Sequence, residues 1–409
     1  MAKIALFCLS QSLAHAGRVV RLARALAARG HHAQTFGDPR WLAHPALCPP
    51  GALPAPIPLS EPPLDDVLRP SRGLPPAFDE VQVFVRALDD DLAALDRLKP
   101  DLVIVDNRRS TPVAAAARGL PCLSLTTTPL LGPFAGPLMT AEQARRLGEG
   151  LLGTPPRGEG ALSGQAAPLP GAMAWAMMRH GAPPRGWLHE LSLGDTTLVL
   201  DPPGLFTPIA APPGARWIGP IFPELRPETS PPRLGPGPWI YLSYGSTGSG
   251  ERLARVATTL LDAGLQVLVS TGGLTTLAPR PGLVCLPLVA PEWAFDAASL
   301  VICHGGTLTV YHALSRGKPV LAVPSHVEQL VSAAAVERLG VGAALSERAV
   351  DADPGRLVST ARALLGDPDV SARAVSLAAR FDGASALAEA VAAAEGLLAP
   401  KVNPGKALQ

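Results

Sequence analysis

The sequence predicts an α/β protein with two doubly wound parallel sheets that face each other across a cleft. Short apolar runs alternate with stretches of helical periodicity over residues 1–125, and the same alternation resumes at residue 239. A proline-rich segment at residues 202–238 separates the two regions, as semi-rigid connectors between domains do. The length of 409 residues suits two domains of about 150–200 residues each.

The first half begins with a strand, a helix and a strand. Residues 4–9 are uniformly apolar, which is typical of a strand buried in a parallel sheet. Apolar residues then recur at helical spacing until Gly30 ends the helix. The predicted elements of this half are a strand at 4–9, a helix at 19–27, a strand at 33–36, a loop at 41–76, a helix at 81–98, a strand at 100–106, a helix at 111–118, a strand at 121–125, a helix at 171–179 and a strand at 197–200.

Two stretches of the first half allow more than one interpretation. The helix at 171–179 is rich in methionine and alanine, and it fits a buried helix, a wall of an apolar pocket or a membrane-surface helix, of which we favour the first. The acidic triplet Asp89, Asp90 and Asp91 lies on the helix at 81–98, where we expect a solvated face.

The second half repeats the pattern after the proline-rich segment. Its predicted elements are a strand at 239–244, a glycine-rich loop at 245–250, a helix at 251–263, strands at 266–270, 283–286 and 300–303, a helix at 307–315, a strand at 319–323, and helices at 329–339, 354–365 and 370–398. We therefore place an N-terminal domain at 1–215, a linker at 216–238 and a C-terminal domain at 239–409, whose last helix is free to pack back on the first domain. Ligands of such sheets bind at the carboxyl ends of the strands, which here face the cleft.

Composition excludes several classes of protein. The 35 Lys and Arg against 34 Asp and Glu give a net charge of +1, so no overall field recruits nucleic acid. Five cysteines without a CxxC pair predict neither a disulfide framework nor a zinc site. We expect no signal peptide and no transmembrane segment, and hence a soluble cytoplasmic protein; peripheral membrane contact stays open, and the oligomeric state is not indicated.

The clearest chemical signal follows the strand at 300–303. There the chain delivers His304 and two glycines to the start of a helix, with Thr307 and Thr309 adding hydroxyl groups. Backbone N–H groups and the helix dipole at such a turn attract an anion, so the pattern predicts a phosphate or diphosphate site. The alternative is an ordinary strand–helix turn that uses glycine for packing.

Residues 304–329 resemble the donor-binding signature of GT-B fold, family 1 type glycosyltransferases. Those enzymes have a His-Gly-Gly-x-Gly-Thr loop followed by Ala-Leu, Gly-x-Pro and Pro-x-x-x-Asp-Gln. His15 precedes His31 by the interval that separates two Gly-His motifs in that family. Residues 217–220 resemble its linker motif and 242–246 its first C-domain strand and phosphate loop. The resemblance covers residues 1–40, 99–130 and 195–345.

The resemblance implies a role for each matched position. His15 would be the general base and Asp106 its orienting acid, while His304 would contact the diphosphate. Glu328 and Gln329 would hold hydroxyl groups of the donor sugar. The implied donor-binding residues are Gly245, Ser246, Thr247, His304, Gly305, Gly306, Thr307, Thr309, His312, Glu328 and Gln329, and no metal ligand is implied.

The implied reaction is an inverting sugar transfer that needs no metal and no cofactor. The co-substrate would be a UDP- or dTDP-sugar, and the acceptor a hydroxyl group of a small, apolar natural product or lipid. We expect the charge-poor loops of residues 130–180 to bind this acceptor. Imidazole suits the base because it titrates near neutral pH and a neighbouring carboxylate fixes its tautomer.

Three residues depart from the family pattern. Leu308 replaces a glycine in the phosphate turn, His312 replaces a glutamate that grips both ribose hydroxyls, and Glu328 replaces an aspartate. Loss of the ribose carboxylate makes a dTDP-sugar as plausible as a UDP-sugar. Two alternatives therefore stay open: an auxiliary protein that binds a sugar nucleotide without catalysis, and a sugar-nucleotide epimerase.

Overall fold

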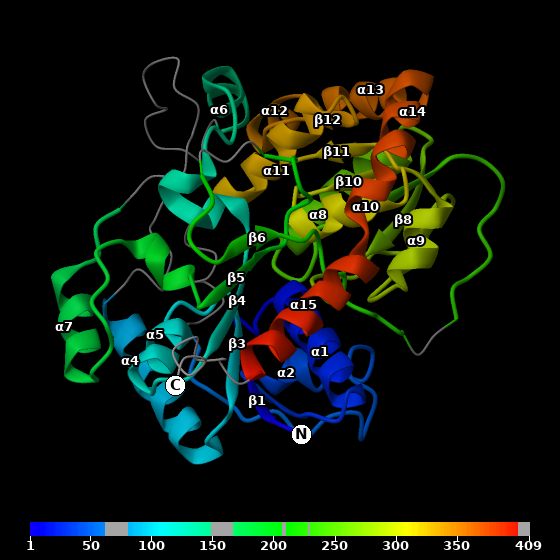
Figure 1. Ribbon diagram of the computed structural model, residues 1–409. Helices are drawn as coiled ribbons and strands as arrows, with labels where there is room; N and C mark the ends of the chain where they lie inside the picture. The colour runs from blue at the N-terminus through cyan, green and yellow to red at the C-terminus, as the bar shows by residue number, and fades with distance from the viewer. Residues whose placement is uncertain (62–80, 149–166, 207–209, 228–229, 400–409) are drawn as a thin grey trace, which may run out of the picture.

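The computed structural model describes residues 1–61, 81–148, 167–206, 210–227 and 230–399. Within these residues it contains two parallel sheets of six strands each, in the orders β2-β1-β3-β4-β5-β6 and β12-β11-β10-β7-β8-β9. Figure 1 shows the first sheet in the lower half of the molecule and the second in the upper half. The prediction of two doubly wound parallel sheets is confirmed.

The first sheet separates two hydrophobic cores. Because successive residues of a strand point to opposite faces, Ile4 and Leu6 of β1 pack with α1, while Ala5 and Phe7 pack with α4. The elements of this half are β1 (Lys3–Cys8), α1 (Leu13–Ala28), β2 (His32–Phe36), α2 (Pro39–Leu42), α4 (Val81–Leu98), β3 (Leu102–Asp106), α5 (Thr111–Ala117), β4 (Cys122–Thr126), the 3₁₀ helix η3 (Thr128–Ala135), α6 (Ala141–Leu147), α7 (Gly171–Arg179), the 3₁₀ helix η4 (Leu188–Ser192), β5 (Thr196–Val199) and β6 (Ala215–Trp217).

The second sheet is covered in the same way. Ile240 and Leu242 of β7 pack with α8 and α13, while Trp239 and Tyr241 pack with α9 and α10. The elements of this half are β7 (Trp239–Ser243), α8 (Gly250–Asp262), β8 (Gln266–Ser270), β9 (Leu283–Leu286), α9 (Pro291–Ala297), β10 (Ala298–Cys303), α10 (Thr307–Ser315), β11 (Val320–Ala322), α11 (Val327–Arg338), β12 (Gly342–Ala344), α12 (Glu347–Ala352), α13 (Pro354–Leu365), α14 (Pro368–Leu377), the 3₁₀ helix η5 (Ala378–Phe381) and α15 (Gly383–Leu398).

The last helix returns to the first half. The single helix predicted at 370–398 is wrong, because the chain bends at Asp382. The Asp382 carboxylate accepts a hydrogen bond from Ala384 N at 2.9 Å and caps α15. Ala386 and Ala390 of α15 then join the core that contains α1, and Figure 1 shows the red α15 beside the blue α1.

Short elements account for the other differences from the prediction. β6 lies within the proline-rich segment and pairs with β5 at the edge of the first sheet. α2, α9, β12 and α12 are likewise too short for a periodic pattern to reveal them. In the loop predicted at 41–76, described residues 43–61 form no helix and pair through one bridge, between Phe36 and Ile57; residues 62–80 lie outside the described residues.

Candidate active site

A strand end and a helix start bring His15 and Asp106 together. β1 and β3 run in parallel with Cys8 opposite Asp106, so both strands end at the same edge of the first sheet. Ser12 caps α1 by accepting a hydrogen bond from Ala14 N, and His15 lies in the first turn of this helix. His15 Nδ1 is 2.9 Å from Asp106 Oδ1. The two residues expected to act as a pair are therefore in contact.

A third side chain, Arg18, completes the cluster and was missed in the sequence. It lies one helical turn after His15 and donates from Nε to Asp106 Oδ2 over 2.9 Å and from Nη2 to Asp106 Oδ1 over 3.1 Å. The same Nη2 is 2.8 Å from His15 Nδ1. The available signal was an arginine on the apolar face of α1, because a buried arginine needs a carboxylate partner.

Asp106 is ionised despite its burial. It is 1% exposed and the Arg18 side chain 7%, whereas 21% of the His15 side chain is exposed. Burial alone would raise the pKa of Asp106, but the charges and hydrogen bonds of Arg18 and His15 outweigh burial and lower the pKa below its ordinary value. Since Nδ1 of His15 faces Asp106, Nε2 on the other edge of the ring is the nitrogen left to meet a substrate.

His304 lies at the corresponding edge of the second sheet. β10 ends at Cys303, and Gly306 is the N-cap of α10. His304 is 5% exposed, and its Nδ1 has no hydrogen-bond partner among the described residues. Burial lowers the pKa of His304 to about 3, so the ring is neutral at pH 7. The ring nitrogen nearest Gly306 is Nε2, and a neutral imidazole beside a helix N-terminus suits a hydrogen bond to an anion.

Glycine is required on both sides of His304. Gly305 has a φ of +79°, and a Cβ there would lie 2.9 Å from Gln329 O. Gly245, which follows the neighbouring strand β7, has a φ of +62°, and a Cβ there would lie 3.1 Å from His304 Cε1. A Cβ on Gly306 would lie 2.8 Å from His304 Nε2. The imidazole therefore occupies space that side chains at these positions would fill.

The hydroxyl groups expected around the diphosphate have different surroundings. Thr307 Oγ1 is 3.0 Å from Ser332 Oγ on α11. Thr247 and Thr309 are partly exposed. Ser246 Oγ accepts a hydrogen bond of 3.1 Å from Leu13 N, which lies in the first turn of α1. This bond crosses from the second half to the first and brings the glycine-rich loop to the turn that carries His15.

His312 lies in the core of the second half. It is 5% exposed and stacks on Phe222 and Phe295, with ring centroids 4.3 and 4.7 Å apart. Burial lowers the pKa of His312 to about 3, so the ring is neutral at pH 7. Leu308 packs against the same core.

The two residues expected on the donor sugar differ in exposure. Gln329 is 3% exposed; its Oε1 accepts 2.8 Å hydrogen bonds from the backbone N and the hydroxyl group of Ser325, and its Nε2 is 2.7 Å from His326 Nε2. Its amide thus shapes the start of α11. Glu328 is exposed in the first turn of α11. Burial lowers the pKa of Arg109 from the first half, and the nearby Glu328 charge opposes that shift.

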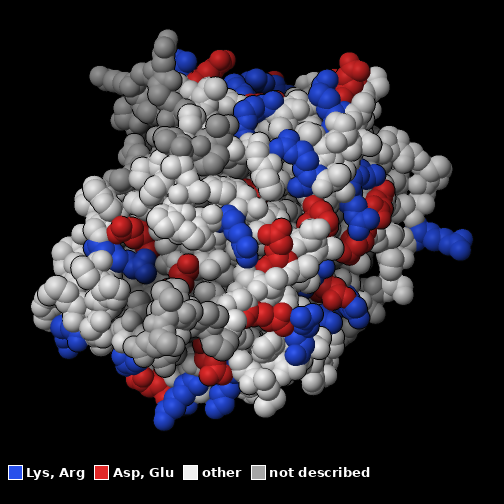
Figure 2. Space-filling view, viewed as in Figure 1, with Lys and Arg blue, Asp and Glu red and all other residues white. Residues whose placement is uncertain are grey.

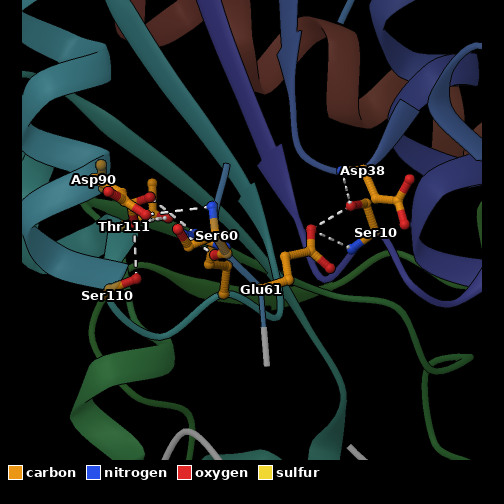
Figure 3. A network of polar contacts seen from close by, with 9 residues as sticks. Ser10, Asp38, Ser60, Glu61, Asp90, Ser110 and Thr111 are labelled. Carbon is orange, nitrogen blue, oxygen red and sulfur yellow. Dashed lines mark hydrogen bonds and ion pairs between the residues drawn. The ribbon is translucent and has the colours of Figure 1, made fainter. Parts of the chain in front are cut away.

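A buried polar network supports the edge of the first sheet. Arg108 Nε is 2.9 Å from Asp91 Oδ1, and both side chains are fully buried. Ser110 and Thr111, labelled in Figure 3, donate to Asp91 Oδ2 over 2.7 and 2.8 Å. The expectation that the acidic triplet lies on a solvated face is therefore wrong for Asp91, which ties α4 to the start of α5.

The loop between β1 and α1 is held by a second set of polar contacts. Glu61 Oε1 accepts hydrogen bonds from the backbone N and the hydroxyl group of Ser10, the former over 3.1 Å. Asp38 N also donates to the Ser10 hydroxyl, as Figure 3 shows. These contacts fix the loop that leads to His15.

The stretch at 130–180 is divided between the two halves of the molecule. α6 packs on α11, where Arg146 Nη2 is 2.5 Å from Glu337 Oε2. α7 packs on α4, burying Met173 and Met177 and leaving Trp175 57% exposed, so the buried helix favoured from the sequence has one exposed face. Residues 149–166 of this stretch lie outside the described residues.

In the described part of the chain, no three His, Cys, Asp or Glu side chains are grouped to hold a metal ion. The helices in that part are too short or too polar to cross a bilayer. Lys and Arg lie interspersed with Asp and Glu over the face seen in Figure 2.

Known proteins resemble this chain in sequence. A profile of the glycosyltransferase family 28 C-terminal domain matches residues 292–393. A PGL/p-HBAD biosynthesis glycosyltransferase of Mycobacterium tuberculosis is 30% identical over 345 residues, which cover 82% of this chain and 78% of that protein. A PGL/p-HBAD biosynthesis rhamnosyltransferase of Mycobacterium bovis is 30% identical over 277 residues, which cover 66% of this chain and 61% of that protein. The chain thus spans about three fifths of the length of the second relative.

The fold also matches a solved structure. The glycosyltransferase VinC in complex with dTDP superposes with a TM-score of 0.65 at 21% identity, covering 97% of this chain and 99% of that one. At this identity the likeness concerns the fold, and it extends over both sheets.

Proposed function

The chain belongs to the glycosyltransferases of the GT-B fold, and we propose that it transfers a sugar from a nucleoside diphosphate to a hydroxyl group of a small, apolar natural product or lipid. The observation that carries this proposal is the hydrogen bond between Leu13 N and Ser246 Oγ. It supports the proposal because the turn with the expected base lies against the loop expected to hold the leaving group. A base and a diphosphate site on opposite walls of one cleft suit direct displacement.

His15 and Asp106 would activate the acceptor. Nε2 of His15 takes the proton of the acceptor hydroxyl while its oxygen attacks the anomeric carbon. The bond from that carbon to the diphosphate oxygen breaks, and its electron pair leaves with the nucleoside diphosphate. One displacement inverts the anomeric centre. Asp106 accepts the Nδ1–H of His15 and stabilises the imidazolium that forms.

The second half would hold the diphosphate. The N-terminus of α10 would supply backbone N–H groups and a favourable dipole, and the partly exposed Thr309 and Thr247 would add hydroxyl groups. His304 is neutral at pH 7, so it would act toward the diphosphate as a hydrogen-bonding group and not as a cation. These groups meet the charge of the leaving group without a metal, and we expect transfer to persist in excess EDTA.

A dTDP-sugar is the favoured donor, with a UDP-sugar as the alternative. His312 stacks on two phenyl rings at the position where the family resemblance implies a ribose-binding glutamate. Position 312 therefore offers no carboxylate to bind a 2′-hydroxyl of the ribose. The dTDP in the VinC structure supports the same choice. The mycobacterial relatives, named for PGL/p-HBAD biosynthesis, support a glycolipid or related natural product as the acceptor.

A melting-temperature screen with dTDP, UDP, GDP and ADP tests the donor half of the proposal. A nucleotide at 100 times its dissociation constant stabilises the folded chain by about 2.7 kcal/mol, which raises the melting temperature by several degrees. A shift with dTDP supports the proposal, and no shift with any nucleotide contradicts it. Binding without transfer to any acceptor would point to the auxiliary protein, and conversion of the sugar nucleotide without acceptor to the epimerase.

A further inference from the structure

Three side chains meet at the end of β3, where a base and its orienting acid would need only two. Arg18 approaches Asp106 side-on, through Nε and Nη2, so that each carboxylate oxygen accepts from it. Asp106 Oδ1 also faces His15 Nδ1 at 2.9 Å, and Arg18 Nη2 lies 2.8 Å from that nitrogen. His15 Nδ1 thus has an anion and a cation at nearly the same distance.

Asp106 and Arg18 require opposite protonation states of His15 Nδ1. Toward the Asp106 carboxylate, Nδ1 must carry a proton and donate it. Toward the Arg18 guanidinium, which carries hydrogens only, Nδ1 would have to be unprotonated and accept. Only the first arrangement leaves the Nε2 lone pair available as a base. That arrangement requires an ionised Asp106, because only a carboxylate accepts the Nδ1 proton without offering one of its own.

We propose that Arg18 is a positioning residue that keeps Asp106 an obligate acceptor and so fixes the single proton of neutral His15 on Nδ1. The planar guanidinium donates to both carboxylate oxygens, which favours the ionised form of Asp106 and sets the plane of the carboxylate. This inference rests on the proposed function, in which Nε2 of His15 takes a proton.

Other charged groups near this corner do not replace Arg18. The charges of Asp106, Glu61, Arg108 and Arg18 all act on the thiol of Cys8 on β1, and burial raises its pKa far above the ordinary value. Cys8 is therefore neutral at working pH. Asp201, at the end of β5, also feels the charge of Arg18. Arg108 forms its ion pair with Asp91, whereas Arg18 contacts Asp106 directly.

Two substitutions separate the charge of Arg18 from its shape. Arg18→Gln removes the cation, so the buried Asp106 charge acts on His15 alone and favours a ring that is protonated at both nitrogens. Arg18→Lys keeps a cation beside the carboxylate and loses the side-on pairing. Arg24→Gln, on the same helix, is the matched control, because Arg24 pairs with Glu224 away from His15.

Nitrogen NMR of histidine-labelled protein reads the proton positions directly, with His15 assigned through His15→Gln. The full-length wild type and Arg24→Gln are expected to carry the proton on Nδ1 alone at pH 7.5. Arg18→Gln is expected to show both nitrogens protonated at that pH, and Arg18→Lys to stay with the wild type. Identical nitrogen signals in wild type and Arg18→Gln from pH 6 to 9, or a wild-type proton on Nε2, would overturn the inference.

The rate of transfer gives a second readout. Arg18→Gln is expected to lose about tenfold or more of kcat/KM at pH 7 and to recover toward wild type by pH 9, where the extra proton leaves. A loss that persists unchanged to pH 9 would mark a merely structural role. If the wild type transfers no sugar, the proposed function fails, yet the NMR titration still reports on Arg18. If transfer occurs and the signals do not move, this inference alone fails.

Discussion

The backbone N–H of Leu13 donates to the hydroxyl group of Ser246 over 3.1 Å, although 233 residues separate them in the chain. Leu13 opens the helix that carries His15, and Ser246 lies in the glycine-rich loop after β7. The bond therefore joins the two halves of the molecule where the proposed function places acceptor and donor.

Ser246→Ala removes this contact and a hydroxyl expected near the diphosphate. A hydrogen bond contributes about 0.5–1.5 kcal/mol, so kcat/KM for the donor is expected to fall roughly 2- to 13-fold. Without nucleotide, loss of the bond to Leu13 should lower the unfolding free energy by about the same 0.5–1.5 kcal/mol. Ser359→Ala is a matched control, because the Ser359 hydroxyl is exposed and donates to Arg356 O on α13. Equal kinetics in wild type and Ser246→Ala would remove Ser246 from the site.

His15→Gln and Asp106→Asn test the base and its partner. Loss of a general base typically costs about 10²–10⁴ in rate, so both variants are expected to lose transfer on that scale. The melting-temperature shift with dTDP should survive in His15→Gln, because the proposed function places the diphosphate in the other half. Near-normal turnover in His15→Gln would show that another group takes the proton.

Gly305→Ala tests the diphosphate loop. The left-handed backbone and the 2.9 Å approach to Gln329 O both exclude a Cβ at this position. We expect the dTDP-induced melting-temperature shift to vanish while the fold of the second sheet persists. Gly264→Ala is the control, because Gly264 also has a positive φ, +75°, but a Cβ there meets nothing within 4 Å. If both variants bind dTDP like the wild type, the ligand lies elsewhere.

Because His312 is buried in its neutral form, we expect it to make the unfolding free energy depend on pH. Burial lowers the pKa of His312 in the folded chain to about 3, against an ordinary value of 6.5. Below pH 6.5 the unfolded chain therefore gains a proton that the folded chain does not, and stability falls by about 1.4 kcal/mol per pH unit until about pH 3. In His312→Phe, denaturant unfolding should show this slope reduced by that amount between pH 6 and 4. Parallel curves for the two proteins would refute it.

Breaking the buried ion pair of Arg108 and Asp91 should lower the unfolding free energy more than breaking a surface pair. Removing one partner of a buried pair costs about 3–5 kcal/mol, so Arg108→Met is expected to lose that much unfolding free energy. Arg118→Met removes a pair with Asp96 that lies largely exposed and should cost about 1 kcal/mol or less. Urea unfolding of both variants compares them, and equal losses would contradict the assignment.

Long periodic segments made the fold predictable from the sequence. β1, α4 and β7 each carry an unbroken apolar pattern and lie within a few residues of their predicted bounds, whereas α1 begins at Leu13, six residues before its predicted start. The break at Asp382 was missed because alanines continue on both sides of it, and only the carboxylate cap distinguishes the two helices. β6, a three-residue edge strand, lacks the length to show any pattern.

The site was predictable where residue type and position determine it. His15 and Asp106 follow strand ends that a parallel sheet brings together, so their contact follows from topology. The burial of Asp91 and the stacking of His312 depend on which side chains face one another across elements, and a single sequence does not contain that information. The apolar face of α1 signals a buried partner for Arg18, but it does not say which carboxylate that partner is.

The most direct test of the central claim is a transfer reaction with purified protein, dTDP-sugars and apolar hydroxylated acceptors, including a glycolipid precursor. Mass spectrometry follows the glycosylated acceptor, and nucleotide analysis follows the released dTDP. We expect the two products in equal amounts with wild type and a loss of both in His15→Gln. Tight binding of dTDP with no product from any dTDP- or UDP-sugar, or full turnover in His15→Gln, would contradict the account.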